Sequence, residues 1–297
     1  TLYLGSSSGL MAVNVSTGAV STYNVDGTIE AISADGNYLL ISEPTAFSIF
    51  YFSVPTLTVP YTASGETNSS AYTPDSKFNE WLNGNLLGIG FPTTFLSTTT
   101  LPYTGNFLDI SGEGGLTYIS SSAHEVHVLA TCNQSEVQVP ALTANSPTLI
   151  KAIPNGTGAV AADSPAIDVI TTGTLQPGCP PTAPSSIASF DMGVGPFNAQ
   201  QMFMSPDSSN AWIITDLPEL LFFYLTDSTA HAIPLTGGAI AYSGGITLDS
   251  AHVYLGTGDG TVHRIDVASN SDVQQIGVGL KDPNGNAVVP NLVYVLP

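Results

Sequence analysis

The sequence contains very little positive charge. Four of its 297 residues are lysine or arginine, against 23 aspartates and glutamates, which gives a formal net charge of −19. Binding to nucleic acid needs clustered cations that displace the counterions around phosphates, and docking on an anionic membrane surface needs them as well. The composition therefore excludes both of these partner classes.

Long apolar runs and charged residues in general are also scarce. The longest apolar run, Leu220–Leu225, has the length of a strand, far short of the ~18 residues of a membrane-spanning helix, so we expect no membrane insertion. Charged residues make up 9% of the chain, against about 25% in an average soluble protein. The surface must then be mostly Ser, Thr, Asn, Gln and Gly, which suits secreted proteins and subunits that stack on one another. Whether a segment precedes Thr1 stays open.

What the sequence does contain is an internal repeat. A turn signal built from Asp, Asn, Gly, Ser and Pro recurs between pairs of short apolar stretches, and these residues form turns for known backbone reasons. Ser33-Ala-Asp35-Gly36 and Ser205-Pro-Asp207-Ser208 are two clear copies. The key positions of all copies are 35, 75, 113, 155, 207, 249 and 291.

Each repeat contains four short β segments. In the last full repeat, 245–248 precedes the turn, and 252–255, 261–267 and 273–278 follow it. β-branched residues and alternation favour strands, and no segment has the periodicity of an amphipathic helix. Four strands in about 40–45 residues are typical of a propeller blade. We therefore predict one all-β domain over residues 1–297, a seven-bladed β-propeller with four-stranded antiparallel blades.

The repeat also resembles a known family. Met204-Ser-Pro-Asp207 with Trp212-Ile-Ile214, and Val253-Tyr-Leu255 with Val262-His-Arg-Ile-Asp266, are similar to the bacterial YVTN/NHL-like propellers. The ending Pro290–Pro297 resembles the closing strand of secreted propellers of acidobacterial type. The resemblance implies a propeller fold and export to the cell surface or beyond. It supplies no shared catalytic residues.

Closure of the ring leaves two alternatives. The segment Thr1–Gly5 aligns with a second strand, so a first strand from the C-terminus would close the ring by pairing the two ends of the chain. Asn286–Val289 aligns as that first strand, yet Leu292–Leu296 is also apolar and strand-like. Either Leu292–Leu296 is itself the closing strand, or it is a surplus strand that pairs with another subunit.

The two cysteines are predicted to form a disulfide. Cys132 follows the third strand of one repeat, and Cys179 lies in a Pro-rich insertion after the third strand of the next. Equivalent loops of adjacent blades emerge on the same face, so a Cys132–Cys179 bond is geometrically reasonable. It would fit an oxidising compartment.

No motif predicts a catalytic residue, a metal site or a cofactor. His124 and His127 are three positions apart on a predicted strand, so their side chains face opposite sides. The other histidines, His231, His252 and His263, lie in other repeats. The Gly258-Asp259-Gly260 segment has oxygen ligands of the calcium type but lacks the spacing of a calcium hand, and turn formation explains it.

Asn-x-Ser/Thr acceptors for N-linked sugar occur at four places, which are possible glycosylation sites. They are Asn14, Asn68, Asn133 and Asn155.

Three function classes remain. The first is an extracellular structural or adhesive protein that forms homo-oligomers or a surface fibre. The second is a propeller module that binds an extracellular peptide, protein or glycan where its loops converge. The third is a lyase or hydrolase with a site at the propeller mouth, which would need histidines and carboxylates clustered there. We expect the first, and no enzyme activity.

Overall fold

The structure is a computed structural model that describes most of residues 2–295. The described chain has gaps at 7–8, 14–19, 24–27, 44–47, 54–57, 65–66, 92–93, 138–140, 144, 146, 173–184 and 279–291. It divides into two compact units, a central unit (Ile29–Phe190) and a terminal unit (Thr1–Thr28 with Asp191–Pro297). The predicted single domain over 1–297 stays a prediction.

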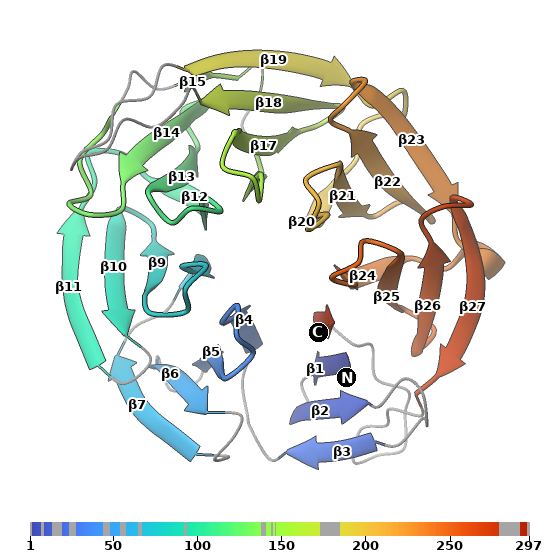
Figure 1. Cartoon of the computed structure of the whole chain (residues 1–297), viewed down its shortest axis with the longest axis horizontal. Helices are drawn as coiled ribbons and strands as arrows, with labels where there is room; N and C mark the ends of the chain where they lie inside the picture. The colour runs from blue at the N-terminus through green and yellow to red at the C-terminus, as the bar shows by residue number, and fades with distance from the viewer. Residues whose placement is uncertain are drawn as a thin grey trace. The chain divides into compact units, whose positions relative to one another are not determined.

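The described residues form seven four-stranded sheets (Figure 1). Four of them lie in the central unit: β4 (Thr28–Ile32), β5 (Tyr38–Glu43), β6 (Ser48–Ser53) and β7 (Thr58–Ser64); β8 (Ser69–Tyr72), β9 (Asn79–Asn83), β10 (Leu86–Phe91) and β11 (Thr94–Thr100); β12 (Gly105–Ile110), β13 (Leu116–Ser121), β14 (Glu125–Ala130) and β15 (Ala141–Leu142); β16 (Leu149–Ala152), β17 (Gly158–Asp163), β18 (Ala166–Thr172) and β19 (Ser185–Asp191).

Three sheets lie in the terminal unit. They are β28 (Leu292–Val295), β1 (Leu2–Ser6), β2 (Gly9–Val13) and β3 (Val20–Tyr23); β20 (Ala199–Met204), β21 (Asn210–Thr215), β22 (Glu219–Tyr224) and β23 (Thr229–Pro234); β24 (Ala241–Ile246), β25 (His252–Thr257), β26 (Thr261–Asp266) and β27 (Ser271–Gly277). A 3-10 turn, Thr236–Gly238, follows β23. Among the described residues, no helix has the length and apolar character that a membrane crossing requires.

The two ends of the chain share one sheet. Strand β28 pairs antiparallel with β1, with Leu2 opposite Val295 and Gly5 opposite Leu292. The sheet order is β28-β1-β2-β3, so β1 is the second strand, as predicted, and β28 is the first. The last apolar segment thus pairs with the N-terminal strand, as the first alternative expects. Closure of the ring stays a prediction, and Asn286–Val289 lies outside the described residues.

Six of the seven predicted turns lie in the described residues, and each joins the first strand of a sheet to the second. In each turn the fourth residue donates its backbone N–H to the carbonyl of the first at 2.8 or 2.9 Å. That fourth residue has a φ between 57° and 78°, a left-handed conformation in which glycine is least strained. The fourth residues are Gly36, Ser76, Gly114, Gly156, Ser208 and Ser250.

Serine at this strained position links one turn to the next. The Ser76 hydroxyl accepts a hydrogen bond from the Asp35 backbone N–H at 2.9 Å, and Ser250 accepts one from Asp207 at 3.4 Å. The turns also pack closely, since a Cβ added at Gly112 would lie 1.7 Å from the Pro154 carbonyl oxygen. Consecutive turns within each unit are therefore held together directly.

First strands of neighbouring sheets are joined in a second way, by a side chain that binds backbone groups. The Gln201 side-chain amide accepts from the Gly244 N–H at 2.6 Å and donates to its carbonyl at 3.2 Å. In the central unit, the Ser69 hydroxyl makes the same pair of contacts with Leu108 at 3.0 and 3.3 Å. One polar side chain thus satisfies a donor and an acceptor of the adjacent strand, which an apolar side chain would leave unpaired.

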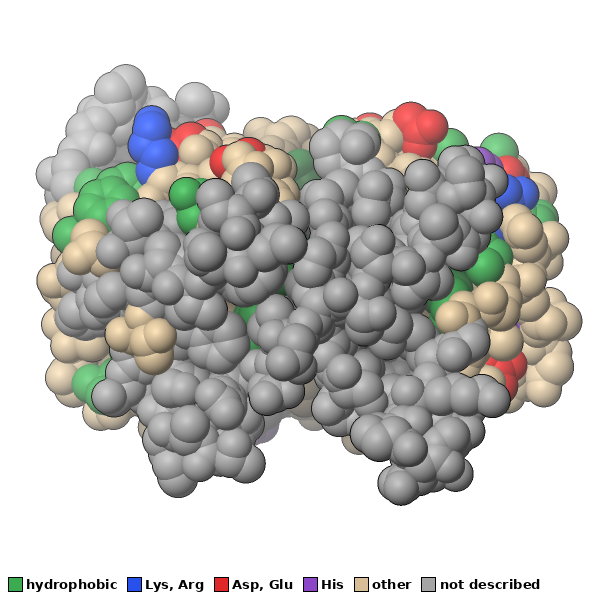
Figure 2. Space-filling model, turned by 90° about the horizontal axis from the view of Figure 1, so that it is seen from below, with side chains coloured by type: hydrophobic (Ala, Val, Ile, Leu, Met, Phe, Trp, Pro, Cys, Tyr) green, Lys and Arg blue, Asp and Glu red, His purple; other side chains and the backbone are tan. Residues whose placement is uncertain are grey.

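Apolar side chains fill the space between adjacent sheets. Trp212 stacks on Phe222 with 4.7 Å between ring centroids, and both belong to a cluster that reaches Leu255 on β25. The Trp212 ring nitrogen donates to the Ser205 hydroxyl at 2.9 Å, which ties the ring to its own turn. On the face shown in Figure 2, the described surface consists mostly of uncharged atoms and carries few charged side chains.

Candidate functional site

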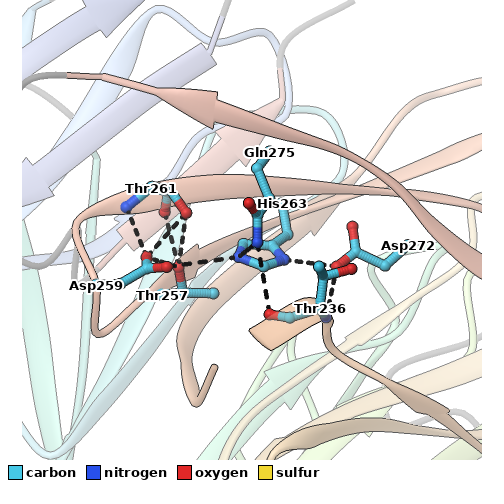
Figure 3. A network of polar contacts seen from close by, with 7 residues as sticks. All are labelled: Thr236, Thr257, Asp259, Thr261, His263, Asp272 and Gln275. Atoms are coloured by element: carbon cyan, nitrogen blue, oxygen red, sulfur yellow. Dashed lines mark hydrogen bonds and ion pairs between the residues drawn. The ribbon is translucent and has the colours of Figure 1, made fainter. Parts of the chain in front are cut away.

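A polar network of the terminal unit surrounds His263 on β26 (Figure 3). The imidazole is fully buried, with 0% of its side chain exposed. Its Nδ1 donates to Asp272 Oδ2 on β27 at 2.7 Å. On its other side, Nε2 lies 3.5 Å from the Gln275 amide nitrogen and 4.0 Å from Asp259 Oδ2. The ring is therefore held on both of its nitrogen atoms.

Asp259 occupies the hairpin turn between β25 and β26. Its Oδ1 accepts hydrogen bonds from the hydroxyls of Thr257 and Thr261 at 2.6 and 2.8 Å and from the Thr261 N–H at 2.9 Å. Burial acts to raise the pKa of Asp259, but these hydrogen bonds outweigh it and lower the pKa below its ordinary value. The turn assigned to 258–260 from the sequence is confirmed, and its carboxylate braces the hairpin.

Asp272 joins this network to the neighbouring sheet. Its Oδ2 also accepts the backbone N–H of Thr236, just beyond β23, at 2.9 Å. Burial alone would raise the pKa of Asp272, but the hydrogen bonds from Thr236 and His263 lower it. An ionised, buried carboxylate thus binds two sheets of the terminal unit.

A related network lies around His127 on β14 in the central unit. Nδ1 lies 2.7 Å from Glu136 Oε1, and Nε2 lies 3.2 Å from Glu125 Oε2. The Tyr103 ring stacks on the imidazole, with 3.4 Å between centroids and an interplanar angle of 10°. Burial, followed by the charges of Glu136 and Glu125, raises the pKa of Tyr103. In both networks the carboxylate follows the histidine by nine residues.

The same pairing, in which a carboxylate orients an imidazole, is found where a histidine acts as a general base. Here, however, the exposed fraction of the side chain is 0% for His263 and 4% for His127. A base must reach the proton it removes, and these rings are covered. The geometry therefore serves to connect strands in the folded chain.

Buried carboxyl groups form a second set of polar positions. Glu80 on β9 is 1% exposed, as are Asp163 at the end of β17 and Asp168 on β18. Burial raises the pKa of Glu80 to about 7. These residues were not among the candidates from the sequence, where their signal is weak: a carboxylate within a strand.

The histidines considered as metal ligands have different surroundings. His124 lies in a turn with φ of 61° and is exposed, whereas His127 points into its sheet and is buried. His231 on β23 stacks against Phe222, and His252 lies on β25. The described residues contain no group of three or more His, Cys, Asp or Glu side chains that could hold a metal ion.

The predicted disulfide can be followed at one end only. Cys132 is exposed in the turn after β14, as expected. Cys179 falls within 173–184, outside the described residues, so the Cys132–Cys179 bond stays a prediction.

Three of the four glycosylation acceptors lie in described positions, and all three are exposed. Asn133 Oδ1 accepts from the hydroxyl of Ser135, and Asn155 Oδ1 from that of Thr157, both at 2.7 Å. Asn68 differs from these two. Its Oδ1 accepts from the Gly84 N–H, and Ser70, the hydroxyl residue of its acceptor motif, has a buried hydroxyl group. Asn14 lies outside the described residues, and modification at all four stays a prediction.

Several solved structures share this architecture. The β-propeller domain of Cps50 (Swd1) from Myceliophteria thermophila has a TM-score of 0.69 at 8% identity, with 89% of this chain and 90% of that chain covered. U3-55K has a TM-score of 0.68 at 13% identity, covering 86% and 83%. Hydrazine synthase from Kuenenia stuttgartiensis has a TM-score of 0.59 at 15% identity, covering 82% and 78%.

At these identities the likeness shows the fold alone, and that fold is a β-propeller. No protein-family model matches the chain, and neither does any curated protein. The resemblance to YVTN/NHL-like propellers of acidobacterial type therefore stays a prediction.

Proposed function

We propose that the chain is an extracellular structural or adhesive protein, a closed seven-bladed β-propeller that assembles with copies of itself at the cell surface. The seven four-stranded sheets support the blade number. The antiparallel pairing of β28 with β1 supports closure by the two ends of the chain. The propeller folds of the solved structures support the ring architecture.

The observation that carries the self-assembly is the edge strand β11, Thr94–Thr100. It is the outermost strand of its sheet and contains neither a charged residue nor a proline. Leu96 is 47% exposed, and Ser97 and Thr98 beside it are exposed too. Natural edge strands are usually protected by lysine, proline or inward charges. In the described part of this edge, the feature that discourages pairing with a strand of a second copy is the bulge opposite 89–90.

The overall charge sets the conditions for such assembly. A net charge of −19 repels copies from one another, and salt screens that repulsion over about 10 Å at 0.1 M. We therefore expect association to strengthen with ionic strength.

Light scattering and electron microscopy of the protein over a range of concentrations test this. The wild type should form assemblies at high concentration, and Leu96→Lys should remain monodisperse. The matched control is Ala232→Lys, which places the same charge on the exposed edge strand β23. Monodisperse wild-type protein at high concentration and high salt would refute self-assembly, and equal effects of both variants would refute the role of β11.

A second candidate, a peptide- or glycan-binding module, is supported by an exposed aromatic side chain. Tyr242 on β24 is 43% exposed and Ile240 just before it is 36% exposed. The Tyr242 ring rests on Gly258, where an added Cβ would lie 3.0 Å from it. A supported aromatic face presents apolar area and a hydroxyl at low entropic cost. A glycan array should show binding that Tyr242→Ala abolishes and Tyr242→Phe retains; an array without any bound glycan would contradict this role.

We propose no catalytic activity. A lyase or hydrolase needs a general acid or base in contact with its substrate, and the two oriented histidines described above are covered by protein.

The proposed extracellular location has a separate test. Mass spectrometry of unreduced native protein should identify a peptide joined through Cys132 and Cys179, and free thiols at both positions would contradict the expected oxidising compartment.

A further inference from the structure

Glu80 is a carboxyl group buried between two sheets of the central unit. Its Oε2 accepts a hydrogen bond from the Thr117 hydroxyl on β13 at 2.5 Å. Its Oε1 is buried and has no hydrogen-bond partner among the described residues. A buried carboxylate oxygen without a donor is costly, whereas a protonated carboxyl group carries no charge into the interior.

Asp163 and Asp168 form a second buried site on the hairpin of β17 and β18. Asp163 lies opposite Ala166 in the register, so Asp168, two residues further, points to the same face. Asp163 Oδ2 accepts the Asn145 N–H at 2.9 Å, but Oδ1 has no donor among the described residues, and neither has Oδ2 of Asp168. The negative charge of Asp163 disfavours ionisation of Asp168. A proton on the pair removes this repulsion between two buried carboxylates.

The cations of the central unit are engaged elsewhere. It contains two, Lys77 and Lys151. Lys77 Nζ lies 2.9 Å from Asp75, and Lys151 Nζ lies 3.4 Å from Asp109. Neither lysine pairs with Glu80, Asp163 or Asp168. Among the described residues, Glu80 accepts from Thr117 and Asp163 accepts from Asn145. A proton is the remaining means of neutralising either site.

We propose that Glu80 and the Asp163–Asp168 pair each hold one proton in the folded protein, and that the fold is consequently most stable in mildly acidic surroundings. This inference does not depend on the proposed structural role, because it concerns carboxyl groups buried inside the central unit.

The direction of the pH dependence follows from the two sites. Burial raises the pKa of Glu80 from 4.5 to about 7, with the Thr117 hydrogen bond opposing it. Burial raises the pKa of Asp168 from 3.8 to about 6, opposed by Ser189 and reinforced by Asp163. The folded chain then binds more protons than the unfolded chain between about pH 4 and 7, so stability rises as the pH falls through this window.

Exposed turn carboxylates set the lower limit of the window. Hydrogen bonds from Lys77 and Thr73 lower the pKa of Asp75 to about 2. A carboxyl group whose pKa is lowered in the folded chain stabilises the fold at pH values above its ordinary pKa. This stabilisation is lost as the pH falls below that pKa. Asp35, with a pKa lowered by hydrogen bonds despite burial, acts in the same direction. The stability maximum should therefore lie between about pH 4 and 6.

Urea unfolding of the full chain at pH values from 4.5 to 8 tests the proposal. The wild-type folding equilibrium constant should rise at least about tenfold per site as the pH falls through this range. Glu80→Gln and Asp168→Asn, which keep the shape of the neutral acid, should each flatten this dependence. Glu219→Gln, at a partly exposed glutamate of the terminal unit, is the matched control and should leave the slope unchanged.

A direct readout covers variants that fail to fold. Carbon-13 NMR of the wild-type carboxyl groups should show two resonances that titrate above pH 5.5, and carboxyl resonances that all titrate below pH 5 would overturn the proposal. Unfolding at pH 7.5 with added calcium or magnesium distinguishes a cation from a proton. If the metal stabilises the wild type but not Asp168→Asn, a metal ion rather than a proton neutralises the aspartate pair. That result would overturn the proposal at this pair.

Discussion

The sheets β12–β15 and β24–β27 hold a histidine in the same place and cover it differently. In each, an imidazole on the third strand donates to a carboxylate nine residues later at 2.7 Å. Asp272 lies on a full fourth strand and its side chain is 3% exposed. Glu136 lies between strands, 35% exposed, and an aromatic ring covers the histidine instead.

The difference shows which part of the arrangement determines stability. A hydrogen bond to a buried carboxylate gains strength from a low local dielectric, and its loss leaves an unpaired charge inside the protein. A half-exposed glutamate can turn to water when its partner is removed. The same histidine–carboxylate spacing should therefore matter much more in β24–β27 than in β12–β15.

The largest effect is expected for His263→Ala. Removing the imidazole leaves Asp272 buried with one donor fewer, which should cost about 3 kcal/mol of unfolding free energy. Chemical unfolding at pH 7 measures this. A loss below that of the corresponding His127 variant would break the comparison.

His127→Ala should cost less, about 2 kcal/mol, because Glu136 and Glu125 can be hydrated while the loss of ring packing remains. The same unfolding measurement applies. Glu136→Gln in the wild-type background serves as a control, since it keeps a side-chain oxygen that can accept from the His127 imidazole. A cost equal to that of His263→Ala would show that burial of the carboxylate is not the deciding factor.

Asp272→Asn should cost about 1 kcal/mol at pH 7, since the amide oxygen still accepts but carries no charge. The pKa of Asp272 is lowered in the folded chain, so the stabilisation is present at neutral pH and fades as the pH drops below about 4. The variant and the wild type should therefore converge in stability at acidic pH. A constant difference from pH 3 to 7 would contradict this account.

The smallest effect is expected for Tyr103→Phe, within about 0.5 kcal/mol of the wild type. The Tyr103 hydroxyl is buried without a hydrogen-bond partner among the described residues, so its removal loses little. Tyr103→Ala removes the stacked ring and should cost clearly more. Equal costs for the two variants would assign the role of Tyr103 to its hydroxyl.

The repeat made much of the fold predictable. Gly36, Ser76 and Ser250 stand where a left-handed residue is needed, so the turn signal located the boundary between first and second strands in six of seven repeats. The strands predicted at 252–255 and 261–267 begin at the predicted residues in the structure, as β25 and β26. Local backbone chemistry decides these features, and local sequence reports it.

The candidate sites were less accessible from sequence because they depend on contacts between sheets. Gln201 lies 43 residues from Gly244, and Glu80 lies 37 residues from Thr117, a separation that no local pattern reveals. The shared spacing of nine residues after His127 and His263 was a usable signal. In each case it links a histidine to the carboxylate that binds its Nδ1 atom.

The pairing of β28 with β1 has a mechanical consequence. Leu2 and Val295 face each other at one end of the ladder, while Gly5 and Leu292 face each other at the other. Tension applied to the chain at residues 2 and 295 would therefore peel the two strands apart one rung at a time, rather than shear all rungs at once. The force that separates the two strands one pair at a time is far below the force needed to slide the same strands past each other.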